Sequence, residues 1–286
     1  MTTRAVVFGG GGLFGIGWET GVAVGLAEAG IDLCKADLFV GTSAGANVAA
    51  QINAGLTPGE LLQRQTDPAR REKEIPYPRG LQEIMVETSR LKAGARDYKH
   101  ALQLIGHYAL ATPTVTEEER RAVITARLNL HNLNDWPSAN IAITAVEASS
   151  GERVVFNRNA GVSLADAVTA SSALPGIWPP VTIGNSRYID GGVYSMENAD
   201  LAAGYDRVII LQPITSLFPE TALQVQLEQL EKKGSRTRVI VPAGPVMAAL
   251  SEKDANPLDS SIREVAALLG REQGQKEASS LADFWN

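Results

Sequence analysis

A serine flanked by glycines lies at the point where an apolar segment gives way to a helix-compatible one. The motif Gly41–Gly45 reads Gly-Thr-Ser-Ala-Gly, follows Leu38–Val40 and precedes Ala46–Asn53. A G-x-S-x-G sequence between a strand and a helix is typical of a nucleophile elbow, a turn in which the serine takes strained backbone dihedrals. The flanking glycines let the strand and the helix approach each other. The motif therefore predicts Ser43 as a nucleophile and the Ala44 amide as a donor to a developing oxyanion.

Four consecutive glycines form a second candidate site near the start of the chain. The segment Gly9–Gly12 follows an expected strand at Ala5–Phe8, and a helix is expected at about Ile16–Ala29. Glycines in such a turn expose backbone N–H groups that can hold a negative charge. The favoured interpretation is an oxyanion hole, in which the amides of Gly11 and Gly12 meet the charge that forms when the serine attacks an ester.

The same glycines also fit nucleotide-binding patterns, which the flanking residues disfavour. Gly10, Gly12 and Gly15 match the dinucleotide fingerprint G-x-G-x-x-G, which expects an acidic residue about 20 positions further on, at the end of the second strand. Asp32 and Asp37 both precede that strand. A P-loop is excluded because no Lys-Ser or Lys-Thr follows the glycines. We therefore expect no nucleotide and no other cofactor.

An aspartate at the end of another strand-like segment is the candidate base. Asp190–Gly192 reads Asp-Gly-Gly and follows Arg187–Ile189. This sequence is also an ordinary turn. However, none of the histidines of the chain follows the aspartate, so the order Ser, Asp, His of the α/β-hydrolase triad is impossible. Asp190 must act directly as the base, or Ser43 is not catalytic. The histidines are His100, His107 and His131.

In combination these motifs resemble the patatin-like phospholipases. Members of that family carry a glycine-rich oxyanion segment, a G-x-S-x-G elbow, and a D-G-G or D-G-A segment that supplies the aspartate of a Ser–Asp dyad. All three occur here in order, and Ala170–Pro175 is similar to a fourth element of the family. The resemblance covers residues 4 to about 212. It implies Ser43 as nucleophile, Asp190 as base and the Gly10–Gly12 amides as oxyanion donors, with Gly15, Gly41, Gly45, Gly191 and Gly192 as structural glycines.

The chain departs from the family pattern at one position. The family usually has Arg or Lys two residues beyond the glycine triplet, whereas this chain has Phe14. If Phe14 lines the mouth of the pocket, uncharged short or medium acyl esters are expected to be better substrates than diacyl phospholipids. Alternatively, Phe14 packs under the first helix, and any phosphate is contacted by Arg and Lys residues of an inserted helical region.

The resemblance implies a serine acyl hydrolase of the esterase, lipase or phospholipase A type. Such an enzyme cleaves carboxylic esters of lipids through an acyl-enzyme intermediate and takes a lipid or a small acyl ester as its substrate. Two alternatives stay open. The first is acyl transfer to an acceptor other than water, and the second is a non-catalytic lipid-binding protein on the same fold.

Apolar segments alternate with helical patterns along the chain, which indicates an α/β fold with a mostly parallel sheet covered on both faces. The resemblance implies a three-layer α/β/α arrangement in a single domain over residues 1–286. A hairpin is expected at Ile141–Ala148 and Arg153–Asn157. Further elements are expected as follows: a helix at Ser163–Ala173, strands at Arg207–Leu211 and Arg238–Val241, and a helix at Thr221–Lys233.

A helical insertion is expected at about residues 57–131, within a core of residues 4–212. Its charge balance over residues 60–131 is +2, whereas the remainder of the chain carries −8. The insertion is either a cap over the active site or a plain packing layer. A C-terminal helical extension is expected at about 257–286. Helices of the insertion are expected at about Leu81–Leu91, Tyr98–Leu110 and Thr116–Leu128, and a loop at Asn129–Asn134.

The composition limits which binding partners and which cellular compartment are expected. The net charge of −6 argues against a nucleic-acid partner and against strong attachment to anionic membranes. Transient contact with a membrane or micelle is compatible with this charge.

Cys34 is the single cysteine, so no intramolecular disulfide is possible, and we expect it to be a small hydrophobic residue near the core. Two histidines seven residues apart make a poor metal site, and no metal is expected. Without a signal-peptide pattern or a long apolar run, a cytoplasmic protein is expected.

Overall fold

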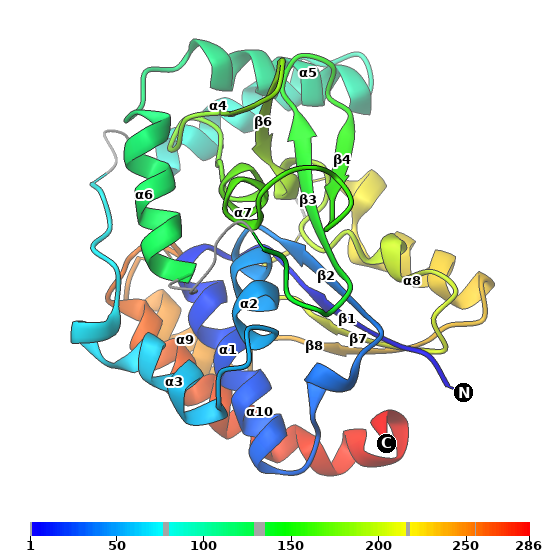
Figure 1. Cartoon of the computed structure of the whole chain (residues 1–286). Coiled ribbons are helices and arrows are strands. Elements are labelled where there is room, and N and C mark those ends of the chain that lie inside the picture. Colours follow the sequence, from blue (N-terminus) through cyan, green and yellow to red (C-terminus); the bar gives the residue numbers. More distant parts are fainter. Residues whose placement is uncertain (1, 77–79, 129–134, 216–217, 255) are drawn as a thin grey trace.

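The computed structural model describes residues 2–286 except 77–79, 129–134, 216–217 and 255 (Figure 1). In these residues one sheet of eight strands has the order β5-β6-β3-β2-β1-β7-β8, and β4 pairs with β3. The strands are β1 (Arg4–Phe8), β2 (Leu38–Thr42), β3 (Ile141–Glu147), β4 (Arg153–Phe156), β5 (Val181–Ile183), β6 (Ser186–Asp190), β7 (Arg207–Leu211) and β8 (Arg236–Ile240).

The five strands β3, β2, β1, β7 and β8 run parallel, and β4, β5 and β6 pair in antiparallel fashion. The helices are α1 (Gly12–Glu28), α2 (Ala44–Ile52), α3 (Pro58–Thr66), α4 (Leu81–Ala93), α5 (Tyr98–Ala111), α6 (Glu117–Leu128), α7 (Leu164–Ser171), α8 (Leu223–Lys232), α9 (Gly244–Ser251) and α10 (Ile262–Trp285). The mixed α/β fold with a mostly parallel sheet, predicted from the alternation of apolar segments, is confirmed.

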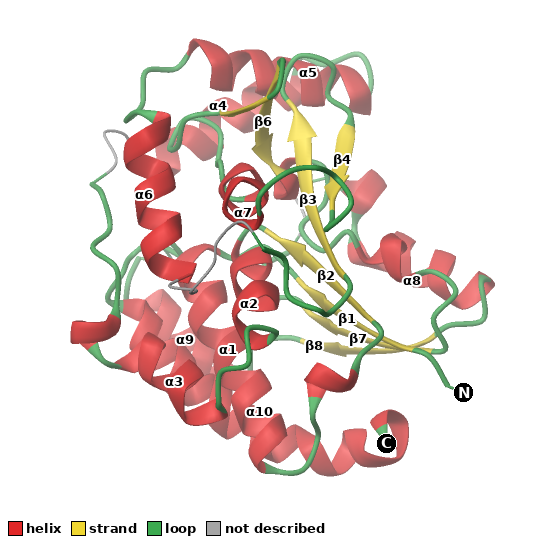
Figure 2. Ribbon diagram, viewed as in Figure 1, coloured by secondary structure: helices red, strands yellow, loops and turns green. Residues whose placement is uncertain are grey.

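Side chains of β1 alternate between two cores, one on each face of the sheet. Val6 and Phe8 belong to the larger core, which also contains side chains of α1, α2, α7 and α10. Ala5 and Val7 belong to a smaller core that contains α8. This period of two is that of a strand buried on both faces. The helices on either side of the sheet give three layers (Figure 2).

The helix α10 packs along α1 over most of its length (Figure 1). Glycines on both helices face the contact. A Cβ atom added to Gly21 would lie 2.1 Å from the carbonyl oxygen of Ala267, and one added to Gly274 would lie 2.4 Å from that of Val22. The backbones therefore touch, and this close crossing fixes α1, the helix that begins at the glycine loop.

The expected elements agree closely with the structure, apart from their ends. The hairpin of β3 and β4 and the helix α7 are confirmed. The first helix begins at Gly12 instead of about Ile16, because the amide of Gly15 already donates to the carbonyl of Gly11 and closes a turn there. The helices α4, α5 and α6 lie where the insertion was expected, whereas the loop at 129–134 falls outside the described residues.

The prediction for Cys34 is wrong in one respect, because the residue is exposed. Its thiol nevertheless donates to the carbonyl of Ile52 at 3.4 Å. Partial burial of the sulfur and the nearby Asp32 carboxylate raise the pKa of the thiol to about 11, so it stays protonated at neutral pH. Among the helices that the structure describes, none is both long and apolar enough to cross a membrane.

Candidate active site

Strand register brings the serine and the aspartate to the same level along β3, from the two strands on either side of it. Thr42, the last residue of β2, pairs with Thr144 of β3. Asp190, the last residue of β6, pairs with Ala145, the next residue of β3. Because Ser43 directly follows Thr42, the serine and the aspartate meet just beyond the ends of their strands. The sheet thus places two residues that are 147 positions apart side by side.

The turn at Ser43 has the strained geometry that its motif predicts. Ser43 has φ 54° and ψ −110°, and α2 begins at the next residue. Non-glycine residues rarely adopt a positive φ, at a cost of about 1–3 kcal/mol. The glycine at position 45 is required by close packing, because a Cβ there would lie 2.1 Å from the carbonyl oxygen of Phe8. The strain aims the hydroxyl away from the sheet and into the pocket, which Ser43 lines.

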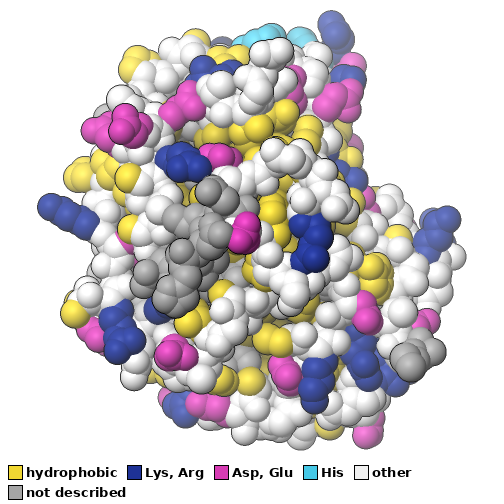
Figure 3. Space-filling model, in the orientation of Figure 1, with side chains coloured by type: hydrophobic (Ala, Val, Ile, Leu, Met, Phe, Trp, Pro, Cys, Tyr) yellow, Lys and Arg dark blue, Asp and Glu magenta, His cyan; other side chains and the backbone are white. Residues whose placement is uncertain are grey.

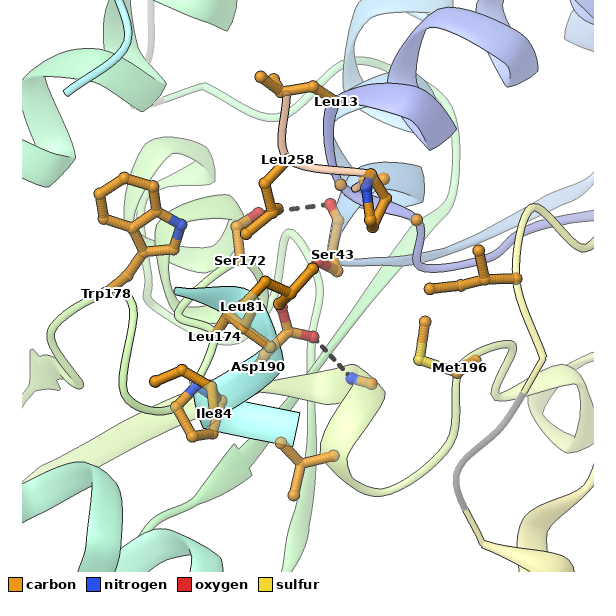
Figure 4. A pocket seen from close by; sticks show the side chains of 18 of the residues that line it. Leu13, Ser43, Leu81, Ile84, Ser172, Leu174, Trp178, Asp190, Met196 and Leu258 are labelled. Carbon is orange, nitrogen blue, oxygen red and sulfur yellow. Dashed lines mark hydrogen bonds between the residues drawn. The ribbon is translucent and has the colours of Figure 1, made fainter. Parts of the chain in front are cut away.

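Ser43 Oγ donates a hydrogen bond of 2.7 Å to Oδ2 of Asp190. The other carboxylate oxygen accepts a bond of 2.7 Å from the amide of Gly192, which orients the group (Figure 4). Asp190 is buried, and burial raises its pKa to about 7, although the hydrogen bonds from Ser43 and Gly192 and the positive charge of Arg120 act in the opposite direction. The carboxyl group therefore titrates near neutral pH.

Two backbone amides of the glycine loop after β1, those of Gly11 and Gly12, are free in the described ranges, whereas that of Gly10 is not. The amide of Gly10 donates to the carbonyl of Met196 at 2.8 Å, so its prediction as an oxyanion donor is wrong. The amides of Gly11 and Gly12 have no hydrogen-bond partner among the described residues, and both residues line the pocket with Ser43. These two amides and that of Ala44 are backbone donors without a partner among the described residues that line the pocket.

The segment just before α10 also packs against Gly12. The φ of Gly12 is +60°, and a Cβ there would lie 2.6 Å from the carbonyl oxygen of Pro257. That carbonyl accepts a hydrogen bond of 3.0 Å from the amide of Phe14. Residues before α10 therefore hold the glycine loop in place.

Three polar side chains that the motifs did not assign tie the elbow to α2 and α7. Ser171 Oγ accepts the amide of Ser43 at 2.9 Å, and Asn47 Nδ2 donates to the Ser43 carbonyl at 3.0 Å. Ser172 Oγ donates to the same carbonyl at 3.3 Å (Figure 4). Ser171 and Ser172 belong to the segment Ala170–Pro175, whose resemblance to a family element was the available signal. Their contacts explain why this segment accompanies the elbow.

A pocket of about 460 Å³ opens beside the two side chains. Its walls are mainly apolar. Leu81 and Ile84 come from α4, Leu174 and Trp178 from the segment after α7, and Leu258 from the segment before α10, whereas α6 contributes arginine side chains (Figure 4). A cavity of this size and polarity suits a small amphiphilic molecule. Residues of the inserted helices thus line the pocket.

Phe14 does not line this pocket, which corrects the expectation based on its position after the glycines. Its side chain is fully buried in the core beneath α1, whereas its neighbour Leu13 lines the pocket. The preference for uncharged esters that rested on an exposed Phe14 therefore has no basis. The alternative, in which Phe14 packs under the first helix, is the one that the structure shows.

No histidine that the structure describes is hydrogen-bonded to Ser43 or Asp190. His100 and His107 lie on α5, where His100 Nδ1 accepts the amide of Arg96 and His107 is exposed. Histidine side chains are visible at the upper edge of the molecule, over α5 (Figure 3). His131 lies outside the described residues. Within the described ranges, no cluster of His, Cys, Asp and Glu side chains could hold a metal ion.

Comparison with known proteins gives a family match and several distant structural neighbours, among them VipD and ExoU. The model of the family described as patatin-like phospholipase matches residues 6–203. VipD from Legionella pneumophila is 11% identical, with a TM-score of 0.45 over 98% of this chain and 67% of that one. ExoU, in its complex with SpcU from the type III secretion system of Pseudomonas aeruginosa, is 18% identical, with a TM-score of 0.41 over 98% and 51%. No curated protein matched the chain.

This chain spans about half to two thirds of the length of those structural neighbours. The mostly parallel sheet and the serine at a strained strand-to-helix turn beside an apolar pocket define the class of protein, an α/β protein with a nucleophile-elbow geometry. The family match extends over more than half of the sequence, and the chain therefore belongs to the patatin-like phospholipase family. The resemblance seen in the motifs is thus confirmed.

Proposed function

We propose that this protein hydrolyses carboxylic esters of lipids through a Ser43–Asp190 dyad. The observation that supports the proposal most is the 2.7 Å hydrogen bond from the Ser43 hydroxyl to a buried carboxylate, inside a mainly apolar pocket. The free amides of Gly11 and Gly12, which line the same pocket as Ser43, would supply the second requirement of acyl transfer, a site for negative charge.

In the first half of the reaction, Ser43 Oγ attacks the ester carbonyl carbon while its proton passes to Asp190 Oδ2. The carbonyl oxygen becomes an oxyanion that accepts hydrogen bonds from the amides of Gly11, Gly12 and Ala44. Each such donor contributes roughly 3 kcal/mol to stabilising the transition state. The oxyanion then collapses, the bond to the leaving alcohol breaks, and the protonated Asp190 returns its proton to the alkoxide.

In the second half, a water molecule attacks the acyl-Ser43 carbonyl and gives its proton to Asp190. The same amides stabilise the second oxyanion. Its collapse breaks the bond to Ser43 Oγ, which takes the proton back from Asp190, and the fatty acid leaves. An aspartate is a weak base towards an alcohol, so we expect modest turnover.

The test uses p-nitrophenyl esters of increasing chain length, lysophospholipids and diacyl phospholipids as substrates, together with a fluorophosphonate that labels activated serines. We expect ester hydrolysis and labelling of Ser43, identified by mass spectrometry. Product formation only when an alcohol acceptor is added would identify an acyltransferase instead. Lipid binding with neither hydrolysis nor labelling would show a non-catalytic binding protein and refute the proposal.

The raised pKa of Asp190 predicts the pH dependence of this activity. Because the base works only when deprotonated, kcat/KM for a neutral ester should be constant above about pH 7 and fall about tenfold per pH unit below it. Initial rates between about pH 5 and 9 measure this profile. A rate that stays constant down to pH 5 would show that Asp190 is ionised throughout that range and that its burial does not govern the activity.

A further inference from the structure

Arg120, on α6, is a buried cation in the pocket wall that the proposed mechanism does not use. It lines the same pocket as Ser43 and Asp190, and its side chain is 5% exposed. Its guanidinium lies over the Trp178 ring, 3.8 Å from the ring centroid. Its Nη1 donates to a carboxylate oxygen of Glu74 at 3.3 Å. Burying a charge in this way is costly unless it is fully paired.

The charges around Arg120 do not balance it. Glu74 also binds Arg127, which in turn donates to Glu72 at 2.6 Å. Glu72 accepts another bond of 2.6 Å from Arg263. Within this buried cluster of described residues, three guanidinium groups share two carboxylates. The cluster therefore holds one more cation than carboxylates, and the further carboxylate that interacts with Arg120 is Asp190 of the same pocket, whose pKa Arg120 lowers. Burial together with repulsion from Arg127 lowers the pKa of Arg120 to about 9, so it stays cationic at neutral pH.

One hydrogen-bond donor of the Arg120 guanidinium has no partner among the described residues. Its Nε is buried and has no hydrogen-bond partner in the described part of the chain. A guanidinium donates from its edge, in a planar fork that matches the two oxygens of a phosphate or a carboxylate. The Trp178 face covers one face of the guanidinium plane and leaves its edge as the donor surface.

We propose that Arg120, held on Trp178, is the subsite for a single anionic group, a phosphate or a carboxylate, carried by the ester substrate. The proposal rests on the proposed function, because it assigns the substrate of that same site. A zwitterionic head group is disfavoured, since its quaternary ammonium would meet the excess positive charge while the Trp178 face, its natural aromatic partner, is already occupied by Arg120. Arg120 is then a specificity-determining residue supplied by the inserted helices.

Binding is measured first, without turnover, in the Ser43→Ala variant. Calorimetry compares decyl phosphate with decyltrimethylammonium and with inorganic phosphate. We expect decyl phosphate to bind and Arg120→Gln to weaken its affinity at least tenfold, with partial retention in Arg120→Lys. The matched control is Arg121→Gln, which removes the neighbouring arginine on the same helix, paired with Asp166 at the surface; its affinity should equal that of the parent.

Specificity is measured next, as the ratio of kcat/KM for a phosphate monoester of monodecanoylglycerol to that for monodecanoylglycerol itself. This ratio should fall at least tenfold in Arg120→Gln and stay unchanged in Arg121→Gln. A general loss of activity lowers both kcat/KM values equally, so their ratio measures specificity alone. If Arg120→Gln fails to fold, inhibition of the wild-type enzyme by decyl phosphate but not by decyltrimethylammonium supports the subsite.

Several outcomes would overturn the subsite. Equal binding of decyl phosphate and decyltrimethylammonium, or an affinity independent of Arg120, would show that Arg120 has a structural role only. Inorganic phosphate that binds as tightly as decyl phosphate would assign the site to a free anion instead of a substrate. If no ester is hydrolysed, the proposed function fails, whereas the binding comparison still tests the subsite separately.

Discussion

Replacing Ser43 by alanine is expected to lower kcat/KM for ester hydrolysis by about 10³-fold or more, to the background of the assay. The substitution removes the hydroxyl that lies 2.7 Å from Asp190, and in the described part of the chain no other hydroxyl donates to that carboxylate. Alanine accepts the same strained turn as serine, so the fold should persist. Hydrolysis of a p-nitrophenyl ester and the circular dichroism spectrum measure the two effects.

A second serine of the same pocket provides the control. Ser172 contacts the backbone carbonyl of Ser43 but not Asp190, so Ser172→Ala should keep activity well above that of Ser43→Ala. A Ser43→Ala protein that retains wild-type turnover would refute the nucleophile assignment. An inactive protein with an altered spectrum would instead mean that the elbow depends on the serine for folding.

Replacing Asp190 by asparagine is expected to lower kcat/KM by about 10³–10⁴-fold and, at the same time, to stabilise the protein above neutral pH. Asparagine is close to isosteric with aspartate but cannot take the proton of Ser43. Its carbonyl oxygen can still accept the amide of Gly192, and its NH₂ group can donate to Ser43 Oγ. The hydrogen bonds therefore survive while the base is lost.

The stability effect follows from the difference in the pKa of Asp190 between the two states. The unfolded chain releases this proton near pH 3.8, whereas the folded protein keeps it until about pH 7. Between these values the folded state binds more protons, so the free energy of unfolding decreases as the pH rises. Above pH 7 the decrease in the free energy of unfolding is complete. It amounts to about 4 kcal/mol, at 1.36 kcal/mol per unit of pKa difference.

Asparagine has no such loss, so the advantage of Asp190→Asn in the free energy of unfolding should be about 1–2 kcal/mol at about pH 5 and about 4 kcal/mol at about pH 8, with a correspondingly larger rise in thermal midpoint at the higher pH. Thermal unfolding of both proteins at the two pH values measures it. An inactive variant with no gain at pH 8 would leave the base assignment intact but would show that burial does not penalise the carboxylate. A variant with wild-type turnover would refute the dyad.

Those parts of the site that depend on local backbone geometry could be predicted from the sequence. The elbow at Ser43 needs small neighbours at fixed positions, and the loop of Gly11 and Gly12 needs exposed amides, so both leave a readable motif. The absence of a histidine after Asp190 then restricted the base to that aspartate. The alternation of apolar segments likewise predicted the parallel sheet, because strand and helix periods are local properties.

The rest depends on contacts between segments far apart in the chain. The amide of Gly10 is not free, unlike those of Gly11 and Gly12, because the carbonyl of Met196, which lies beyond β6, accepts it. Phe14 and Leu13 are adjacent in sequence, but the rotation of α1 turns one into the core and the other into the pocket. Arg120 became a candidate only through its burial beside Glu74, since an arginine in a charged helix is usually a solvated residue.

The crossing of α1 and α10 also sets when the protein can become active during its synthesis. The residues of the dyad, Ser43 and Asp190, are translated before α10, but the glycine loop is held by Pro257 and by the helix that follows it. Contacts between such distant segments form slowly, because closing a long loop costs conformational entropy. A nascent chain that has left the ribosome only up to Asp190 therefore carries a nucleophile and a base without a supported oxyanion hole. We therefore expect ester hydrolysis only from chains in which α10 has docked on α1.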